Sequence, residues 1–206
     1  MARPRSDIRP RLLDSARARF LVDGVDGASL RRIARDAGTN VGMVYYYFKT
    51  KDELFYAVVE EVYSALLSQI GALLEANTTL RDRLLAVALR VGEMTQDELD
   101  IVRIVVRESL VASERREHLL ERFAEGHVGL ILGALQQGVS SGELDPRHPA
   151  PMLLPVVAGA LAIPQFLRRL VGASSPLFLL ALPSSEALAK ASIDIILHGV
   201  GRTEPS

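Results

Sequence analysis

Apolar residues recur at intervals of three and four along almost the whole chain, which is the spacing of one face of a helix. We find no stretch with the alternation of apolar and polar residues that is typical of a half-buried strand. The pattern predicts an all-α protein of about nine helices. They are expected near residues 7–23, 30–37, 41–48, 50–75, 79–96, 98–112, 115–140, 150–170 and 184–199.

The ends of the first four predicted helices carry capping residues. Ser29 and Asn40 have side chains that cap helix N-termini. Gly24 and Gly38 suit the left-handed residue that follows a helix. The run Thr50-Lys51-Asp52-Glu53 has the spacing of a capping box. Two short helices joined by a turn that contains a glycine predict a helix-turn-helix.

The third predicted helix carries three tyrosines and a phenylalanine in succession, at residues 45–48. Because a helix turns by about 100° per residue, four consecutive aromatic side chains cannot all face a core. Its inward stripe is predicted to consist of Val41, Val44 and Phe48. The opposite face is predicted to hold Gly42, Met43 and Tyr46, with Tyr45 and Tyr47 at its edges. Since water gains nothing from such a face, we expect it to meet another molecule.

The N-terminal quarter of the chain is basic and the remainder is acidic. Residues 1–51 hold eleven Arg and Lys against five Asp, a net charge of +6, although the whole chain carries −1. This imbalance favours a polyanion as the partner of the N-terminal quarter. A helix of about eight residues also fits the major groove of DNA, which is roughly 12 Å wide. A solvated basic face is the alternative that charge alone leaves open.

The outward face of the third helix matches DNA chemically. Gly42 allows a close approach of the backbone to the duplex. Met43 and Tyr46 can press on thymine methyl groups or base edges. Tyr45 and Tyr47 can donate hydrogen bonds to phosphates.

Further phosphate contacts are expected beside this helix. Lys51 begins the fourth predicted helix, where free backbone N–H groups also favour a phosphate. Ser29 and Arg31 have the same place at the start of the second. Arg3 and Arg5 form an N-terminal arm that could reach phosphates or a minor groove.

The composition argues against several other classes of protein. Because the chain has no Cys, it cannot form disulfides, zinc–thiolate sites or thiol nucleophiles. The four His do not lie three or four residues apart, and we find no glycine-rich phosphate loop or Gly-x-Ser-x-Gly motif. No catalytic residue, metal or cofactor is therefore expected, and residues 1–10 do not resemble a signal peptide. An all-helical carrier of small molecules without DNA function stays open as an alternative.

One apolar segment approaches the length of a membrane span. Residues 150–167 contain no charged side chain over eighteen positions, although Pro151, Pro155 and Pro164 interrupt the run. A helix that is apolar on all sides is also typical of a buried interface. Because a second apolar helix is predicted near 184–199, we expect an interface between subunits rather than a membrane span.

Residues 8–55 resemble the DNA-binding domain of the tetracycline-repressor (TetR) family of bacterial transcriptional regulators. The order and spacing of the matching residues make a specific signal over about 48 positions. Those residues are Phe20, Gly24, Ser29, Ile33, Ala34, Ala37-Gly38, Gly42, Tyr45-x-Tyr47-Phe48 and Lys51-x-Glu53-Leu54. The rest of the chain agrees with the family only in length, helical pattern and the segment GALQQGVSSGELDP.

The resemblance implies a fold and a set of site residues. It implies a homeodomain-like, three-helix DNA-binding domain at residues 1–50, followed by a helical ligand-binding and dimerisation domain at residues 51–206. The family's DNA-contacting positions fall on Ser29, Arg31, Thr39, Asn40, Val41, Gly42, Met43, Tyr45, Tyr46, Tyr47 and Lys51. Val41 and Met43 stand where hydrogen-bonding residues are frequent in the family, so base preference cannot be transferred from relatives.

The resemblance further implies a homodimeric, cytoplasmic repressor that binds a palindromic operator in double-stranded DNA. The dimer is expected to form through the helices near 150–170 and 184–199. A small and largely apolar effector is expected to bind the C-terminal domain and release the operator. Candidate effector contacts are Met94, Arg103, Arg107, Phe123, His127 and Phe166. A transcriptional activator of the same family is the alternative.

Overall fold

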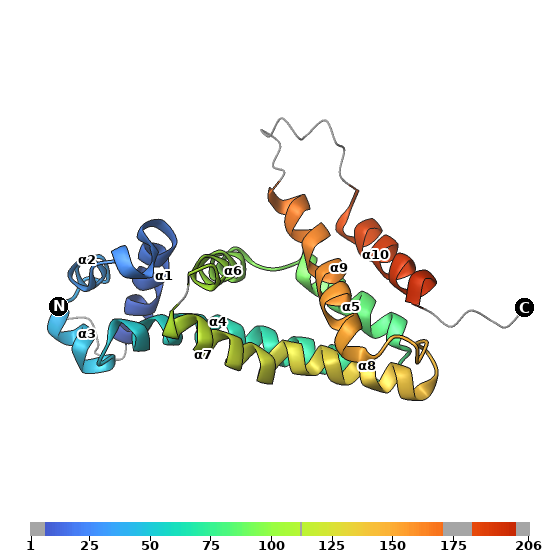
Figure 1. Ribbon diagram of the computed structural model, residues 1–206. Helices are drawn as coiled ribbons and strands as arrows, with labels where there is room; N and C mark the ends of the chain where they lie inside the picture. Colours follow the sequence, from blue (N-terminus) through green and yellow to red (C-terminus); the bar gives the residue numbers. More distant parts are fainter. Residues whose placement is uncertain (1–6, 112, 171–182, 201–206) are drawn as a thin grey trace, which may run out of the picture. The chain divides into compact units, whose positions relative to one another are not determined.

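The computed structural model describes residues 7–111, 113–170 and 183–200, and these are helical apart from short connections (Figure 1). The helices are α1 (Ile8–Gly27), α2 (Leu30–Asp36), α3 (Val41–Tyr47), α4 (Lys51–Leu74), α5 (Leu80–Gly92), α6 (Gln96–Ser109), α7 (Glu114–Phe123), α8 (Gly129–Ser141), α9 (Ala150–Leu170) and α10 (Ser185–Val200). The predicted all-α fold is confirmed. The predicted helix at 115–140 is divided into α7 and α8 by a π-helical segment, Ala124–Val128.

The chain forms two compact units. The first comprises the residues up to Leu66 together with Thr95–Arg122, and so contains α1–α3, most of α4, α6 and α7. The second comprises Leu67–Met94 and the residues from Phe123 onwards, and so contains the end of α4, α5, α8, α9 and α10. These units are defined by packing, whereas the boundary predicted at residue 50 separates a DNA-binding domain from a ligand-binding and dimerisation domain. That boundary stays a prediction.

The core of the first unit is built from the apolar stripe of α1. The buried positions of this stripe before the kink are Leu12, Leu13, Ala16 and Phe20. Phe20 meets Phe55 of α4 edge to face, with the ring centroids 6.0 Å apart. Gly24, the predicted helix end, has a φ of 74° and kinks α1 ahead of its last three residues. This ring contact joins α1 to α4, while α1 also packs against α2 and α6, and α2 packs against α3.

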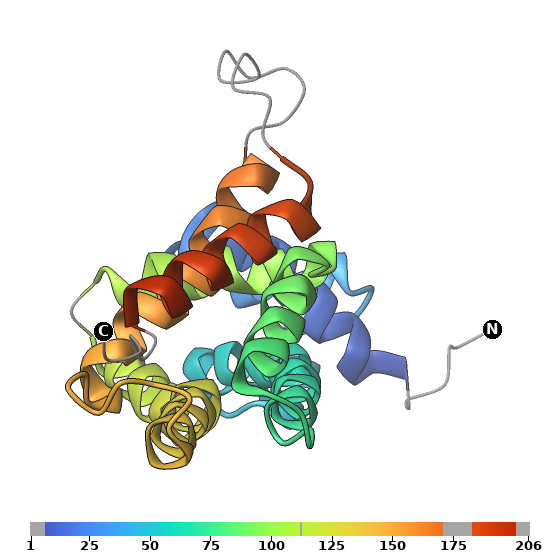
Figure 2. The same cartoon turned by 90° about the vertical axis from the view of Figure 1, so that its right-hand side faces the viewer.

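In the second unit α9 packs against α5, α8 and α10, and Figures 1 and 2 both show α10 lying beside α9. Gln165 of α9 is buried and joins the two helices, since its Nε2 donates to the carbonyl of Ser185 at 2.9 Å. Pro155 and Pro164 lie inside α9 without ending it, and the predicted helix near residues 150–170 is confirmed. Each proline removes one helical hydrogen bond, and the burial of Val157 and Leu161 holds the helix together.

Two described helices, α4 and α9, are long and apolar enough to cross a membrane by length and composition alone. This is weak support for a membrane span, because the core helix of a soluble protein passes the same test. The contacts of α9 with three neighbouring helices are those of a helix packed into a bundle.

The turn between α2 and α3 depends on a glycine. Gly38 has a φ of 67°, and a Cβ at this position would lie 3.1 Å from Nη1 of Arg11. We expect Gly38→Ala to lower the free energy of unfolding by about 1–2 kcal/mol, because an L-residue is strained in the left-handed region. Urea unfolding measures this loss. Gly133→Ala on α8 is the control, since a Cβ there meets no atom within 4 Å; a variant at Gly38 as stable as that control would contradict the expectation.

Candidate nucleic-acid interface

The helix-turn-helix is closed by hydrogen bonds at both sides of Gly38. Arg11 Nη1 donates to the carbonyl of Ala37 at 2.7 Å and so satisfies a group at the end of α2. Thr39 N donates to the carbonyl of Ala34 at 2.9 Å. Asn40 Oδ1 accepts from Met43 N at 3.2 Å and caps α3, as its position in the sequence predicted. These bonds fix the angle at which α3 leaves the turn.

The starts of α2 and α4 are capped less completely than expected. Ser29 is the N-cap residue of α2, but its side chain makes no capping hydrogen bond. Thr50 Oγ1 accepts from Glu53 N at 3.0 Å, which is one half of the predicted capping box. The carboxylate of Glu53 accepts from Lys49 N at 2.6 Å. The hydrogen bond from Lys49 holds the segment between α3 and α4 against the first turn of α4.

The inward face of α3 is buried. Val44 is 0% exposed and Phe48, the C-cap residue, is 5% exposed. Val41 is only partly buried, so the inward stripe consists of two residues rather than three. Two anchored positions four residues apart hold one side of the short helix against the protein and leave the other side free.

The outward face of α3 is exposed. The side chain of Tyr46 is 76% exposed and that of Tyr45 is 55% exposed, while Gly42 is exposed and Met43 partly so. The ring of Tyr46 packs edge to face on Tyr47, with centroids 5.1 Å apart. The tyrosines therefore support one another at the surface and do not enter the core. An exposed aromatic cluster of this kind is suited to contact another molecule.

The remaining predicted DNA contacts surround α3. Arg31 and Asn40 are exposed, and Thr39 is partly exposed. Lys51 Nζ donates to the carbonyl of Asp26 at 2.7 Å. An ammonium has three donors, so two stay available for a phosphate. All eleven predicted residues lie at the start of α2, in the turn, on α3 or at the start of α4, whereas the predicted arm at Arg3 and Arg5 lies outside the described residues.

The six candidate effector contacts lie in both units. Arg103 and Arg107, exposed residues of α6, belong to the first unit, and the other four belong to the second. Phe123 directly precedes the π-helical segment and His127 lies within it, with the ring centroids 5.3 Å apart. Burial lowers the pKa of His127 below its ordinary value, so its imidazole is neutral at pH 7. Met94 is buried and Phe166 is partly buried.

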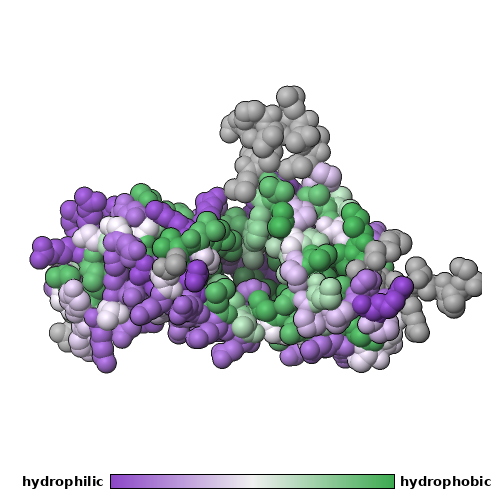
Figure 3. All heavy atoms as spheres, viewed as in Figure 1, coloured by the Kyte–Doolittle hydropathy of each residue, from purple (hydrophilic) through white to green (hydrophobic). Residues whose placement is uncertain are grey.

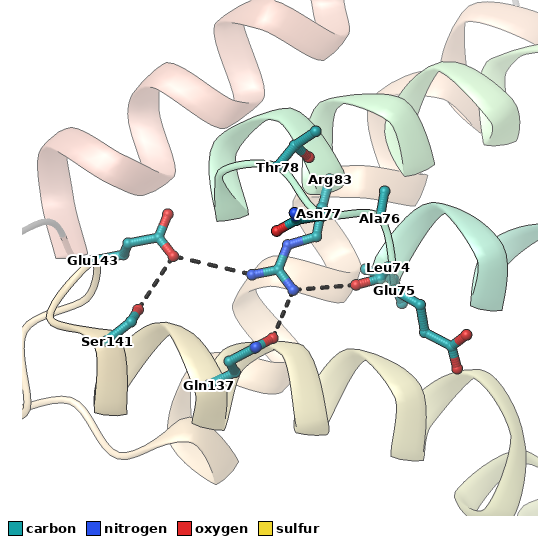
Figure 4. Close-up of a pocket in the computed structure, with 9 residues that line it drawn as sticks. All are labelled: Leu74, Glu75, Ala76, Asn77, Thr78, Arg83, Gln137, Ser141 and Glu143. Atoms are coloured by element: carbon teal, nitrogen blue, oxygen red, sulfur yellow. Dashed lines mark hydrogen bonds and ion pairs between the residues drawn. The ribbon is translucent and has the colours of Figure 1, made fainter.

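A polar pocket that was not among the predicted sites lies in the second unit (Figure 4). It has a volume of about 410 Å³ and is lined by Leu74, Glu75, Ala76, Asn77, Thr78, Arg83, Gln137, Ser141 and Glu143. Arg83 is buried, and its Nη1 donates to Gln137 Oε1 at 2.7 Å and to the carbonyl of Leu74 at 3.1 Å. The sequence did contain a signal for this pocket, because the charged Arg83 shares the inward face of α5 with the apolar residues Leu80 and Val87. The polar lining does not match a largely apolar effector.

Comparisons with known proteins agree with this architecture. The family described as bacterial regulatory proteins, tetR family, matches residues 12–58. The chain is 35% identical over 101 residues to the HTH-type nicotine-responsive transcriptional repressor HdnoR of Paenarthrobacter nicotinovorans, a match that covers 47% of this chain and 50% of that protein. It is 27% identical over 176 residues to the HTH-type transcriptional repressor SCO4008 of Streptomyces coelicolor, covering 83% of this chain and 87% of that protein.

The fold is also found among solved structures. The transcriptional regulator FadR from Bacillus subtilis, in complex with stearoyl-CoA, superposes with a TM-score of 0.73 at 15% identity, and the match covers 93% of this chain and 98% of that one. At such low identity the likeness concerns the fold alone. The family match lies on α1–α3 and the start of α4, which are the elements that present the exposed tyrosines. Together, this match over residues 12–58, the regulators among its relatives and the all-helical fold support a regulator of the TetR family of bacterial regulatory proteins.

Proposed function

We propose that this chain is a sequence-specific DNA-binding transcriptional regulator, a repressor that a small molecule releases from its operator. The observation that carries the proposal is the exposed face of α3, where Tyr46 stands 76% exposed on a helix anchored by buried Val44 and Phe48. The two relatives described above are both named transcriptional repressors, which supports the same function. Such a protein acts where the DNA is, so we place it in the cytoplasm.

In this proposal α3 is the recognition helix. Its seven residues span about 10 Å, which fits across a major groove roughly 12 Å wide. Met43 and Tyr46 then face base edges, and Tyr45 and Tyr47 face the phosphates on either side. Arg31 at the start of α2 is exposed and pairs with no carboxylate among the described residues, so its charge is available to a phosphate. Residues 1–50 form the DNA-binding domain in this scheme, and residues 51–206 form the domain for effector binding and dimerisation.

We infer a homodimer, because a second copy of this short helix would raise the affinity of the protein for its DNA site. Two copies whose recognition helices lie about 34–36 Å apart read successive major grooves of a palindromic site. The proposed interface is the outward side of α9 and α10, which is apolar although it is exposed. The large apolar side chains that are exposed are Met152, Val156, Ile163 and Leu167 on α9 and Ile195 on α10. Figure 3 shows apolar side chains gathered over these two helices.

The proposed effector is small and largely apolar. HdnoR is named as nicotine-responsive, and the FadR structure holds stearoyl-CoA, so regulators with this sequence pattern or fold can respond to organic ligands. In this chain the neutral imidazole of His127 beside Phe123 suits a ligand without a negative charge. The effector must bind the form of the dimer with the wrong helix spacing more tightly than the operator-binding form, because a ligand shifts an equilibrium only by that difference in affinity.

The experiment that tests the proposal is selection of genomic DNA fragments by the purified protein, followed by titration of the selected fragment. A repressor or an activator binds a palindromic site, and a reporter placed behind that site tells the two apart. A carrier without DNA function binds no fragment even at low salt, and this outcome would refute the proposal. Addition of candidate metabolites to the complex then identifies the effector by loss of binding.

The affinity for the selected fragment is expected to fall steeply with salt. The slope of log affinity against log salt should be about −0.9 for each phosphate neutralised. Arg31→Ala should make this slope shallower by about 1 for each recognition helix and should weaken selected and random DNA to a similar extent. Fluorescence anisotropy at several salt concentrations measures the slope. Arg81→Ala, which removes an exposed arginine paired with Asp194 in the second unit, should leave it unchanged.

A further inference from the structure

Arg115 of α7 joins three carboxylates from three other helices of the first unit. Its Nε donates to Glu108 of α6 at 3.0 Å, its Nη1 to Asp52 of α4 at 3.0 Å, and its Nη2 to Asp26 of α1 at 2.7 Å. We call these four residues the Arg115 cluster. A guanidinium has five donors in a fixed plane, so it can hold three acceptors at once, which a lysine ammonium on a flexible chain cannot do with the same geometry.

The cluster is buried on one side and open on the other. The side chain of Arg115 is 12% exposed and that of Glu108 is 7% exposed, whereas Asp52 and Asp26 are 49% and 75% exposed. Burial alone would lower the pKa of Arg115, but hydrogen bonds to Glu108, Asp52 and Asp26 outweigh it and raise the pKa further above its ordinary value. The guanidinium is therefore charged at every pH at which the protein folds. Loss of Arg115 would leave Glu108 as an unpaired buried charge, which is strongly destabilising.

The cluster lies next to the connection that carries the recognition helix. Asp52 is the second residue of α4, and only residues 49 and 50 separate this helix from Phe48, the C-cap residue of α3. Asp26 is held a second time, since its carbonyl accepts from Lys51 Nζ at 2.7 Å. The bond from Lys49 N to the Glu53 carboxylate leaves this connection little freedom. The position of the start of α4 therefore sets the position of α3.

Other contacts attach α7 to α4 without reaching α1. Arg122 makes two hydrogen bonds to Glu60 of α4, at 3.0 and 2.7 Å. The ring of His118 packs against that of Tyr56 of α4 in a tilted arrangement, with ring centroids 4.3 Å apart. Arg115 differs from these residues because it donates hydrogen bonds both to α1 and to the first turn of α4, the two elements on either side of the helix-turn-helix.

We propose that Arg115 is a positioning residue for operator binding: it holds α1 and the start of α4 in the one arrangement in which α3 fits its site. This inference rests on the proposed DNA-binding function. It predicts that loss of the cluster lowers the affinity for the operator more than the affinity for random DNA, because random DNA is bound through phosphates and tolerates a misplaced helix.

The test uses a pair of substitutions that keep the net charge. Arg115→Met with Glu108→Gln removes one positive and one negative charge, and it leaves no buried charge behind, while Asp26 and Asp52 stay solvated. We expect this double variant to fold and to bind the operator at least ten-fold more weakly than wild type, with unchanged affinity for random DNA at the same salt concentration. Arg115→Lys should recover only part of the operator affinity.

The matched control is Arg122→Met with Glu60→Gln, which removes a charged pair between α7 and α4 and should keep the ratio of operator to random-DNA affinity. A folded Arg115→Met, Glu108→Gln variant with the wild-type ratio would overturn the inference while leaving the proposed function intact. If the control variant shows the same fall in the ratio of operator to random-DNA affinity, the inference is also overturned. Any contact between α7 and α4 would then have the effect that we assign to Arg115. Wild-type protein that binds no DNA would overturn both proposals together.

Discussion

Replacement of Tyr46 by alanine is expected to weaken operator binding by about 10- to 100-fold without loss of folded protein. The ring is 76% exposed, so its removal takes almost no buried surface from the core. In the complex the same ring is expected to meet base edges, where a specific contact contributes about 1–3 kcal/mol. Because each 1.4 kcal/mol is a factor of ten, the expected loss follows from one such contact.

Titration of the selected fragment and of a scrambled fragment with the variant measures this effect. The operator affinity should fall much more than the affinity for the scrambled fragment, and the unfolding midpoint should stay within a degree or so of wild type. Tyr46→Phe keeps the ring and removes the hydroxyl, so it distinguishes an apolar contact from a hydrogen bond. Val22→Ala, at a residue that is 73% exposed on α1, is the control for loss of an exposed apolar side chain. Full operator affinity of Tyr46→Ala would show that α3 does not read bases through this residue.

The prediction for Tyr46 could be made from the sequence because it depends only on local geometry. Once Val44 and Phe48 are assigned to the inward side of a short helix, the period of 3.6 residues places Tyr46 outward, and the structure confirms this orientation. The caps at Gly38 and Asn40 are equally local and are confirmed by their φ value and hydrogen bond.

The sequence also contains local signals for two features that were not predicted, a capping box and a π-helical segment. Thr95 and Glu98 form a complete capping box, in which Thr95 N donates to Glu98 Oε2 at 2.7 Å and Glu98 N donates to Thr95 Oγ1 at 3.3 Å. The spacing of these two residues in the sequence predicts this box, and the box explains why α6 begins at Gln96. The π-helical segment had a weaker signal, because Gly126 alone suggests an irregular backbone inside a helix.

The Arg115 cluster could not have been predicted from spacing. Its members come from α1, α4, α6 and α7, and up to 89 residues separate them along the chain. Hydrophobic periodicity identifies which face of each helix is inward, but it does not say which helices are neighbours. The packing of α6 and α7 into the same unit as α1–α3 therefore emerges only from the three-dimensional structure.

Introduction of glutamate at Val156 of α9 or Ile195 of α10 is expected to convert the proposed dimer into a monomer. On α9 the buried face includes Leu153, Val157 and Leu161, whereas Val156 lies on another side of the helix and is 57% exposed. On α10 the residues Ala187, Ala191 and Ile195 are all exposed at a spacing of four. A charge buried between two such faces without a partner is strongly unfavourable, whereas the same charge is well solvated in the monomer.

Loss of the dimer should lower operator affinity by about 10²- to 10⁴-fold. In the dimer, binding of one recognition helix holds the second close to its half-site, and a monomer lacks this advantage. Light scattering after gel filtration gives the mass of each variant, and titration of the selected fragment gives its affinity. Leu110→Glu is the control: this residue is apolar and 83% exposed, but it is the C-cap residue of α6 in the other unit, so the variant should stay dimeric and bind the operator. If both variants at α9 and α10 stay dimeric, the interface lies elsewhere. A monomer with full operator affinity would instead show that one recognition helix suffices.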